Sequence, residues 1–165
     1  MSKEVISDDF MNKNIDRIIK KNKKDKIGHV SPSFYVTLSG YDGFKSVSNL
    51  KIVKDLKSKK FDNLLIPIHF SSHWILINIA VTSKTIKIYD SLNGQHPIIS
   101  EKFINFLNYI GMKNFKIQYV NCPKQKNISD AGILVLEFVR CIVENENVSN
   151  IKVSNIAQIK QRLVK

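Results

Sequence analysis

Apolar residues recur at helical spacing through the first third of the chain. Ser7 and two acidic residues precede such a pattern that runs to Ile19, as expected for an N-capped amphipathic helix. Ser31 and the proline after it predict a second, short helix through Leu38. The apolar positions between 47 and 56 predict a third helix.

The pattern then changes to that of strands. Residues 63–70 and 73–82 are rich in β-branched and aromatic residues, and residues 85–89 alternate between apolar and polar. Short turns at 71–72 and 83–84 separate these segments, so they predict an antiparallel meander of three strands. The middle strand is apolar on both faces and is expected to be central and buried.

Further helices and one strand follow the meander. The expected elements are a helix at 98–110, a strand at 115–120, an almost wholly apolar core helix at 130–145 and an exposed amphipathic helix at 153–164. Helices, then strands, then helices around one sheet indicate the α+β class.

Size and composition fit one folded domain over residues 1–165. The chain is 43% hydrophobic, and no apolar run is long enough to cross a bilayer. The first residues lack the charged-then-apolar pattern of a secretory signal, so we expect a protein of the nucleus or cytoplasm. The two cysteines, Cys122 and Cys141, form neither a disulfide framework nor a zinc-binding pattern and are expected to be reduced and buried.

The formal net charge of +12 favours anionic partners. An equally weighted interpretation is that the lysines simply cover solvated faces. Direct nucleic-acid binding is not expected, because the chain lacks RNA-binding sheet motifs and zinc-finger spacing. The basic run at 20–26 resembles a nuclear address, but we favour the solvated end of a helix, where cations suit the dipole.

Four residues, in this order, carry the candidate chemistry: His73, Asp90, Gln125 and Ala131. A thiol nucleophile needs a base, and His73 at the start of a buried strand can serve as one. Asp90 ends the neighbouring strand, where it can fix the imidazole tautomer. Gln125 and the backbone N–H of Ala131 can donate to an oxyanion. Position 131 begins the core helix, where a thiolate would be stabilised, but the residue is alanine.

Each of these residues also has a simpler interpretation. His73 alone is more often a satisfied core histidine, and an aspartate such as Asp90 is by default a turn residue. Gln125 lies in a polar loop, and Asp130 can cap the core helix. His69 and His73 have no third ligand at a matching spacing, so no metal or other cofactor is expected. The joint order of the residues favours the chemical interpretation.

The chain resembles the ubiquitin-like-protein-specific proteases, the SUMO (sentrin) proteases of the adenovirus-protease-like clan. The matching segments are LLIPIHFSSHWILINIA, TIKIYDSLNG and CPKQKNISDAGILVLEFVRCIV, with a fainter match from VISDDFMN onward. This resemblance implies a papain-like fold, in which a central mixed or antiparallel sheet is flanked by helices. It implies His73 as general base, Asp90 as its orienter and Gln125 as oxyanion donor.

The same resemblance implies a substrate site around the nucleophile position. Trp74 is the expected lid over a narrow tunnel for a Gly-Gly tail, and Asp130 and Gly132 flank position 131. Such a tunnel selects glycine because any Cβ would clash with its walls. Without the resemblance, Trp74 is equally well explained as a core residue.

Two positions depart from the family pattern. Val5 stands where the family commonly has tryptophan, which implies a looser or differently built entrance. Ala131 stands where the family has its catalytic cysteine, so the chain as written should not turn over. Either the cysteine was changed deliberately to trap a substrate, or the chain is a natural pseudoenzyme. The retained His73, Asp90, Gln125 and Trp74 favour the first explanation.

The implied parent activity is hydrolysis of a peptide or isopeptide bond after a C-terminal Gly-Gly. The expected partner is SUMO or another ubiquitin-like modifier, whose acidity suits a basic protease. The alternatives are a non-catalytic modifier-binding module, a deubiquitinase of the same fold and a basic nucleic-acid binder. A monomer without membrane contact is expected.

Overall fold

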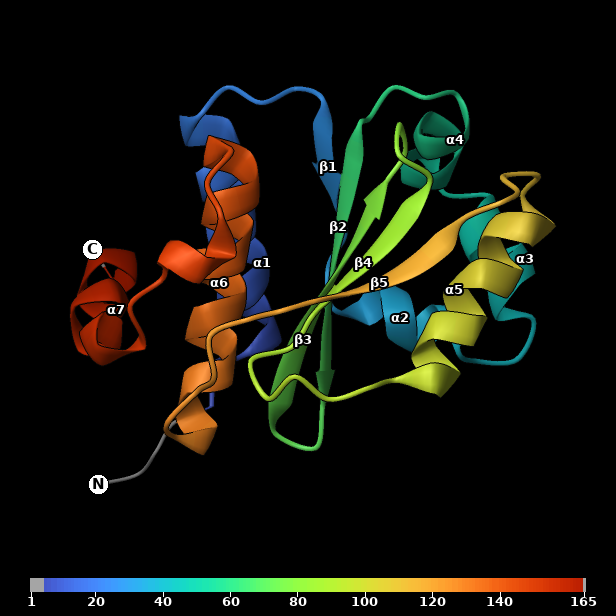
Figure 1. Cartoon of the computed structure of the whole chain (residues 1–165). Coiled ribbons are helices and arrows are strands. Elements are labelled where there is room, and N and C mark those ends of the chain that lie inside the picture. Colours follow the sequence, from blue (N-terminus) through green and yellow to red (C-terminus); the bar gives the residue numbers. More distant parts are fainter. Residues whose placement is uncertain (1–4, 165) are drawn as a thin grey trace.

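The computed structural model describes residues 5–164. Their central element is a five-stranded mixed sheet (Figure 1). The strands, in their order across the sheet, are β1 (Ile27–His29), β2 (Asn63–Phe70), β3 (His73–Ala80), β4 (Thr85–Tyr89) and β5 (Lys116–Val120). Strands β2, β3 and β4 form the predicted antiparallel meander. β1 and β5 each join an edge of the meander in parallel. The predicted α+β class is therefore confirmed.

Helices cover both faces of this sheet (Figure 1). They are α1 (Asp8–Lys21), α2 (Ser33–Leu38), α3 (Gly43–Ser48), α4 (Lys51–Lys57), α5 (Pro97–Tyr109), α6 (Ala131–Glu144) and α7 (Ile156–Val164). Short 3-10 turns lie at Ile128–Asp130, Val148–Asn150 and Val153–Asn155. Among residues 5–164, no helix has the length and apolar character needed to span a membrane.

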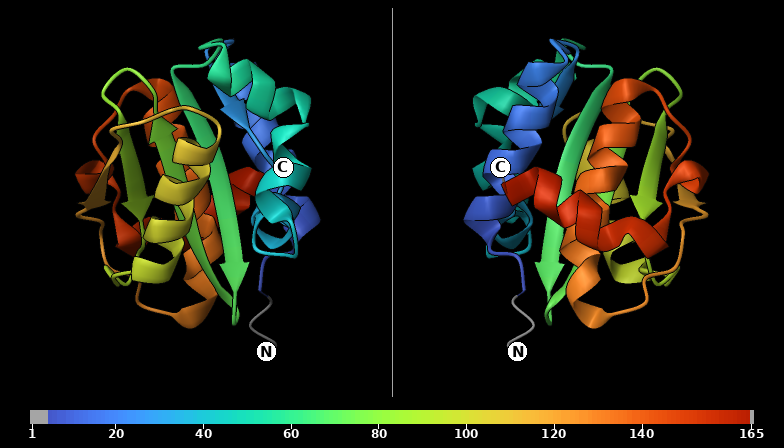
Figure 2. Two further views of the ribbon diagram at one scale, coloured as in Figure 1. Left: turned by 90° about the vertical axis from the view of Figure 1, so that its right-hand side faces the viewer. Right: turned by 90° about the vertical axis from the view of Figure 1, so that its left-hand side faces the viewer.

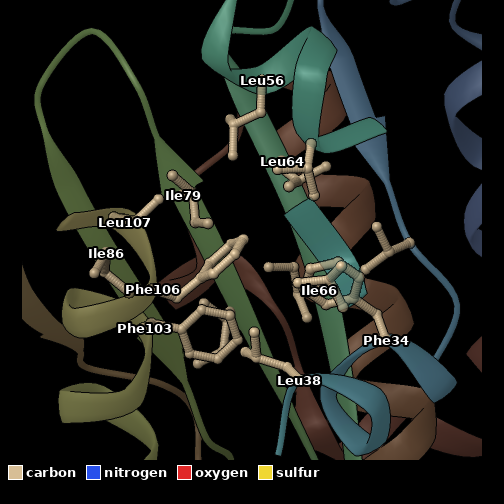
Figure 3. Packing of buried hydrophobic residues seen from close by; sticks show 14 of the residues in the cluster. Phe34, Leu38, Leu56, Leu64, Ile66, Ile79, Ile86, Phe103, Phe106 and Leu107 are labelled. Carbon is tan, nitrogen blue, oxygen red and sulfur yellow. The ribbon is translucent and has the colours of Figure 1, made fainter. Parts of the chain in front are cut away.

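One face of the sheet packs against α2 to α5. Phe103, Phe106 and Leu107 of α5 meet Ile79 and Ile86 of the sheet, as Figure 3 shows. Helices α2 and α4 extend the same core with Phe34, Leu38 and Leu56 (Figure 3). Successive strand side chains point to opposite faces, so alternate residues of β2 and β3 enter this core and the residues between them enter the other.

The opposite face packs against α6 and α1. α6 is buried along almost its whole length, as the apolar run predicts, and it lies against β3 and α1. α7 crosses the outer side of these two helices (Figure 2), where Arg17 of α1 donates to the carbonyl of Leu163. A buried helix on the central strand gives the start of α6 a fixed position beside the start of β3.

The ends of α1 agree with the sequence pattern. The Ser7 hydroxyl accepts from the N–H of Phe10, which confirms the predicted N-cap. Lys20 and Lys21 lie in the last turn, where positive charge suits the helix dipole. The rest of the basic run lies beyond the helix and leads into β1.

Two sequence-based predictions differ from the structure. The strand β1 was not predicted, because its three residues are too few to show a period. The single helix predicted between 47 and 56 is two helices, α3 and α4, interrupted at Asn49 and Leu50. Leu50 has extended backbone, which ends one helix and begins the next even though the apolar spacing continues across it.

The turn between β2 and β3 is the element that fixes the start of β3. Ser71 and Ser72 both have left-handed backbone, with φ of 48° and 63°. Two consecutive left-handed residues define a type I′ turn, whose twist matches that of the two strands. Phe70 therefore pairs directly with His73, and His69 pairs with Trp74.

Candidate active site

His73 and Asp90 meet at the end of the meander where β3 begins and β4 has ended. The register pairs Leu76 with Tyr89, so Asp90 emerges beside the start of β3. His73 Nε2 lies 2.7 Å from Asp90 Oδ1. The side chain of Asp90 is 4% exposed and that of His73 is 15% exposed. The sequence-based expectation that the hairpin brings these two residues together is thus met by the geometry.

The Asp90 carboxylate accepts four hydrogen bonds. Oδ1 accepts from His73 and from the N–H of Leu92 at 2.9 Å. Oδ2 accepts from His96 Nε2 at 2.8 Å and from the N–H of Gly94 at 3.2 Å. Burial by itself would raise the pKa of Asp90, but the hydrogen bonds from His73, Leu92 and His96 outweigh it and lower the pKa to about 2. Asp90 is therefore ionised at neutral pH.

An ionised Asp90 determines which nitrogen of His73 is available for chemistry. A carboxylate only accepts hydrogen bonds, so His73 Nε2 must carry a proton. In the neutral imidazole the other nitrogen, Nδ1, then has the free lone pair. His73 can accept a proton at Nδ1 while Asp90 stabilises the resulting cation.

Gln125 lies in the loop after β5, beside the residue that follows Asp90. The Ser91 hydroxyl donates to Gln125 Oε1, and the Gln125 N–H donates to the Ser91 carbonyl at 2.9 Å. The Asn127 carbonyl can only accept a hydrogen bond, so the side of the Gln125 amide that faces it is the nitrogen. Gln125 Nε2 donates one hydrogen to the Asn127 carbonyl at 3.1 Å. Its second hydrogen is the one that can serve an oxyanion.

Ala131 is the first residue of α6 and is 1% exposed. The first N–H groups of a helix point outward along its axis and carry partial positive charge. A thiol at this position would be acidified by them, whereas a methyl group has no proton to lose. The position fits a nucleophile, and the residue present is not one.

Asp130 and Gly132 flank this position. Asp130 occupies the N-cap of α6, but its side chain makes no capping bond; Oδ2 instead accepts from Asn127 Nδ2 at 3.4 Å. The simpler interpretation of Asp130 as a side-chain cap is therefore wrong.

Trp74 lies between His69 of β2 and Gly132 at the start of α6. A Cβ added to Gly132 would lie 3.0 Å from Trp74 Cδ1 and 3.0 Å from Ile6 Cδ1, so only glycine allows this approach. The ring of His69 stacks on Trp74 with centroids 4.1 Å apart, and His69 Nδ1 lies 2.9 Å from Asp8 Oδ1. Trp74 is 1% exposed, and its buried Nε1 has no hydrogen-bond partner in the part of the chain that the structure describes.

Val5 lies next to Ile6, at the same edge of the site. It is 39% exposed and belongs to no helix or strand. The looser entrance expected from valine at this position stays a prediction.

The two cysteines lie outside this constellation and are buried. Burial raises the pKa of the Cys122 thiol to about 12 and that of the Cys141 thiol to about 11. Cys122 Sγ points at the Val120 carbonyl, 3.4 Å away. Both thiols are neutral at pH 7, so neither replaces the missing nucleophile.

Sequence reasoning missed two side chains in the site. Ser91 directly follows Asp90 in the Tyr-Asp-Ser segment, and that adjacency was the available signal. His96 lies in the loop before α5, and no spacing rule connects it with Asp90. Its contact depends on how the loop folds back through Gly94.

Sequence comparison identifies relatives of this chain. The model of the Ulp1 protease family, C-terminal catalytic domain, matches residues 3–165. Sentrin-specific protease 5 from Mus musculus is 29% identical over 130 residues, which covers 72% of this chain and 17% of that protein. Sentrin-specific protease 3 from Mus musculus is 27% identical over 146 residues, covering 82% of this chain and 25% of that protein. The chain thus spans a quarter or less of the length of these two relatives.

Solved structures agree on the fold. The Ulp1 protease domain in complex with Smt3, the yeast ortholog of SUMO, superposes with a TM-score of 0.82 at 21% identity, over 98% of this chain and 75% of that chain. Xanthomonas campestris XopD bound to ubiquitin gives a TM-score of 0.70 at 12% identity, over 99% of this chain and 92% of that chain. At these identities the likeness establishes the fold, a papain-like sheet flanked by helices. Together with the family match over nearly the whole sequence, it shows that this chain belongs to the Ulp1 protease family.

Proposed function

We propose that the chain is a SUMO-specific cysteine protease domain whose nucleophile position holds alanine. The observation that carries the proposal is a site that lacks only its thiol. His73 is hydrogen-bonded to an ionised Asp90, Gln125 is oriented by Ser91, and α6 begins at Ala131. The parent reaction is hydrolysis of the peptide or isopeptide bond after a C-terminal Gly-Gly.

The first chemical step needs a thiol at position 131. His73 Nδ1 takes the thiol proton while Asp90 holds Nε2, and the thiolate attacks the carbonyl carbon of the terminal glycine. The carbonyl π electrons move to oxygen, and the free Nε2 hydrogen of Gln125 donates to the resulting oxyanion. When the intermediate collapses, the C–N bond breaks, and the His73 imidazolium protonates the leaving lysine amine.

The second step releases the modifier. His73 takes a proton from water, the hydroxide adds to the thioester carbonyl, and the thiolate leaves with a proton from the imidazolium. Water adds its OH to the glycine carbonyl and returns its hydrogen to the enzyme, so the products are a carboxylic acid, which loses its proton to solvent at neutral pH, and the starting thiol. The methyl group of Ala131 can begin neither step, so the chain as it stands binds without cutting.

We expect specificity for glycine to depend on Trp74, the lid over the Gly-Gly tail that the family resemblance implies. Its indole packs so closely on the start of α6 that a Cβ added to Gly132 would lie 3.0 Å from Trp74 Cδ1. The buried Trp74 Nε1 has no partner within the described residues, so a main-chain carbonyl of an inserted tail would satisfy it. Because Trp74 is almost fully covered, the tail must displace it or pass beside it.

The decisive experiment restores the thiol. The Ala131→Cys protein is assayed with fluorogenic SUMO and ubiquitin substrates, and we expect cleavage of SUMO. Ala131→Ser is the matched control, because it has nearly the same size but a much weaker nucleophile, and it is expected to be inactive. Absence of cleavage by folded Ala131→Cys protein with every modifier would contradict the proposal.

Binding by the unmodified chain separates the alternatives. If Ala131→Cys is inactive but the chain still binds a modifier, it is a pseudoenzyme; if neither occurs, the functional proposal fails. Ubiquitin belongs in the panel because a structural neighbour is bound to it. Binding is expected to weaken as salt rises, since a chain of net charge +12 meets an acidic modifier. The expected monomeric state and nuclear or cytoplasmic location remain part of this proposal.

A further inference from the structure

A second histidine contacts the carboxylate that orients His73. His96 Nε2 lies 2.8 Å from Asp90 Oδ2, and His73 Nε2 lies 2.7 Å from Oδ1. The side chains of both histidines are 15% exposed. Asp90 is thus the centre of a buried group of two imidazoles around one negative charge.

The backbone around His96 holds its ring in place. Its N–H donates to the Tyr119 hydroxyl at 3.1 Å, and its carbonyl accepts from the Ser100 hydroxyl at 2.7 Å. Ser100 and Tyr119 also bond to each other at 3.0 Å. Pro97 is the first residue of α5, and its ring fixes the backbone φ angle directly after His96. These contacts come from β5 and α5, so His96 is anchored from two elements.

Gly94 and Phe70 pack against the group formed by His73, His96 and Asp90. A Cβ on Gly94 would lie 3.0 Å from Asp90 Oδ2 and 3.5 Å from His96 Nε2, so a larger residue there would push the loop or the carboxylate aside. The Phe70 ring meets His73 edge-on at 5.8 Å between centroids and His96 at 5.7 Å. Phe70 therefore covers both imidazoles on the same side.

We propose that His96 is a positioning residue that acts on the base, His73, through their shared carboxylate. It holds Oδ2, so that Oδ1 stays directed at His73. It also takes part of the negative charge that would otherwise stabilise the His73 cation. This inference rests on the proposed function only in assigning His73 the role of base.

The direction of the effect follows from charge. Within the described residues, the titratable groups in contact with His96 are Asp90 and the phenol of Tyr119, while His73 faces it across Asp90. A protonated His96 repels a protonated His73, and a neutral His96 still draws charge from Asp90 by donating to it. Removing His96 should therefore make His73 easier to protonate, and its pKa should rise.

The chain with Ala131 is well suited to the test, because His73 titrates there without a coupled thiol. Nitrogen-detected NMR across pH 4 to 9 reports the tautomer and titration of each histidine. We expect protonated Nε2 on both neutral rings and two coupled titration steps. In His96→Gln, which can still donate but cannot carry charge, we expect a single His73 step moved up by about half a pH unit or more.

His29→Gln is the matched control. His29 is also a half-buried histidine beside an aspartate, with Nε2 3.2 Å from Asp16 Oδ1, but on β1. It should leave the His73 titration unchanged. An unchanged His73 titration in folded His96→Gln would overturn the proposal. If that variant does not fold, independent one-step titrations of His73 and His96 in the unmodified chain would overturn it equally.

Kinetics give a second readout that a general loss of stability would not produce. In the Ala131→Cys background, His96→Gln is expected to lower kcat several-fold and leave KM unchanged, with the acidic limit of the rate profile, where the base His73 becomes protonated, moved upward. An effect confined to KM would contradict the assigned role. If Ala131→Cys proves inactive, the proposed function fails, but the NMR titration still decides the role of His96.

Discussion

Two histidine–aspartate pairs lie at the same hairpin and differ in almost everything except residue type. His73 and Asp90 are 2.7 Å apart, with the aspartate 4% exposed. His69 and Asp8 are 2.9 Å apart, with the aspartate 60% exposed. Asp90 also accepts two backbone N–H groups and a second histidine. Among residues 5–164, the histidine is the only partner of Asp8 Oδ1.

The comparison teaches that distance alone does not make a catalytic pair. Water competes freely for an exposed carboxylate, so a pair such as His69–Asp8 contributes less than about 1 kcal/mol. The buried carboxylate is kept ionised by fixed donors, and its orientation cannot drift. His69 contributes instead through its ring, which packs on Trp74. Under the proposed function the first pair takes part in proton transfer, whereas the second holds the ring that packs on Trp74.

The largest expected difference between the two pairs is in kcat. In the Ala131→Cys background, Asp90→Asn should lower kcat roughly 10³- to 10⁴-fold, because an amide carries no charge to stabilise the imidazolium and offers one acceptor oxygen where Asp90 offers two oxygens to four donors. Asp8→Asn should change kcat less than about threefold, because its carboxylate is solvated. Steady-state kinetics measure both. Comparable losses in the two variants would remove the distinction.

The pH dependence of the free energy of unfolding should also distinguish His73–Asp90 from His69–Asp8, by a smaller amount. The pKa of Asp90 is lowered to about 2 in the folded protein from an ordinary value of 3.8. A depressed pKa contributes stability that is present above pH 4 and is lost as the pH falls towards 2. The free energy of unfolding should therefore drop by on the order of 2 kcal/mol across this window through Asp90 alone.

Urea unfolding at a series of pH values measures this contribution. Asp90→Asn should lack that component of the pH dependence, and Asp8→Asn should retain it. A pH dependence in Asp90→Asn as steep as that of the unmodified chain would show that Asp90 is not the group responsible.

The smallest effect concerns the turn at Ser71 and Ser72, which lies between His69 and His73. Ser72 has a φ of 63°, a conformation that costs a residue with a Cβ about 1 kcal/mol or more. Ser72→Gly should raise the free energy of unfolding by about 0.5–1 kcal/mol, part of the gain being offset in the unfolded chain. Ser72→Ala keeps the Cβ and should give no such gain. Chemical unfolding at neutral pH checks both, and a less stable glycine variant would argue against a strained turn.

The sequence was sufficient where a residue's role depends on its strand or helix. Burial of β3 on both faces, the Ser7 cap and the meeting of His73 with Asp90 all follow from period and register. These features depend on local patterns that are repeated over several residues.

It was insufficient where a loop or a short element decides the contact. β1 is three residues long, and the break at Leu50 interrupts an apolar spacing that continues across it. His96 reaches Asp90 only because the loop through Gly94 folds back, which no periodicity encodes. Half of the carboxylate's environment was therefore invisible in the sequence, although the residue itself was identified.

The order of the strands has a consequence for how the site is assembled as the chain folds. His73 and Asp90 are 17 residues apart and belong to one antiparallel hairpin, so closing the loop between them costs little chain entropy. Ala131 reaches them only after the parallel crossover through α5 and β5 is complete, and such non-local pairings form slowly. We therefore expect the base and its orienter to be in place before the nucleophile position arrives beside them.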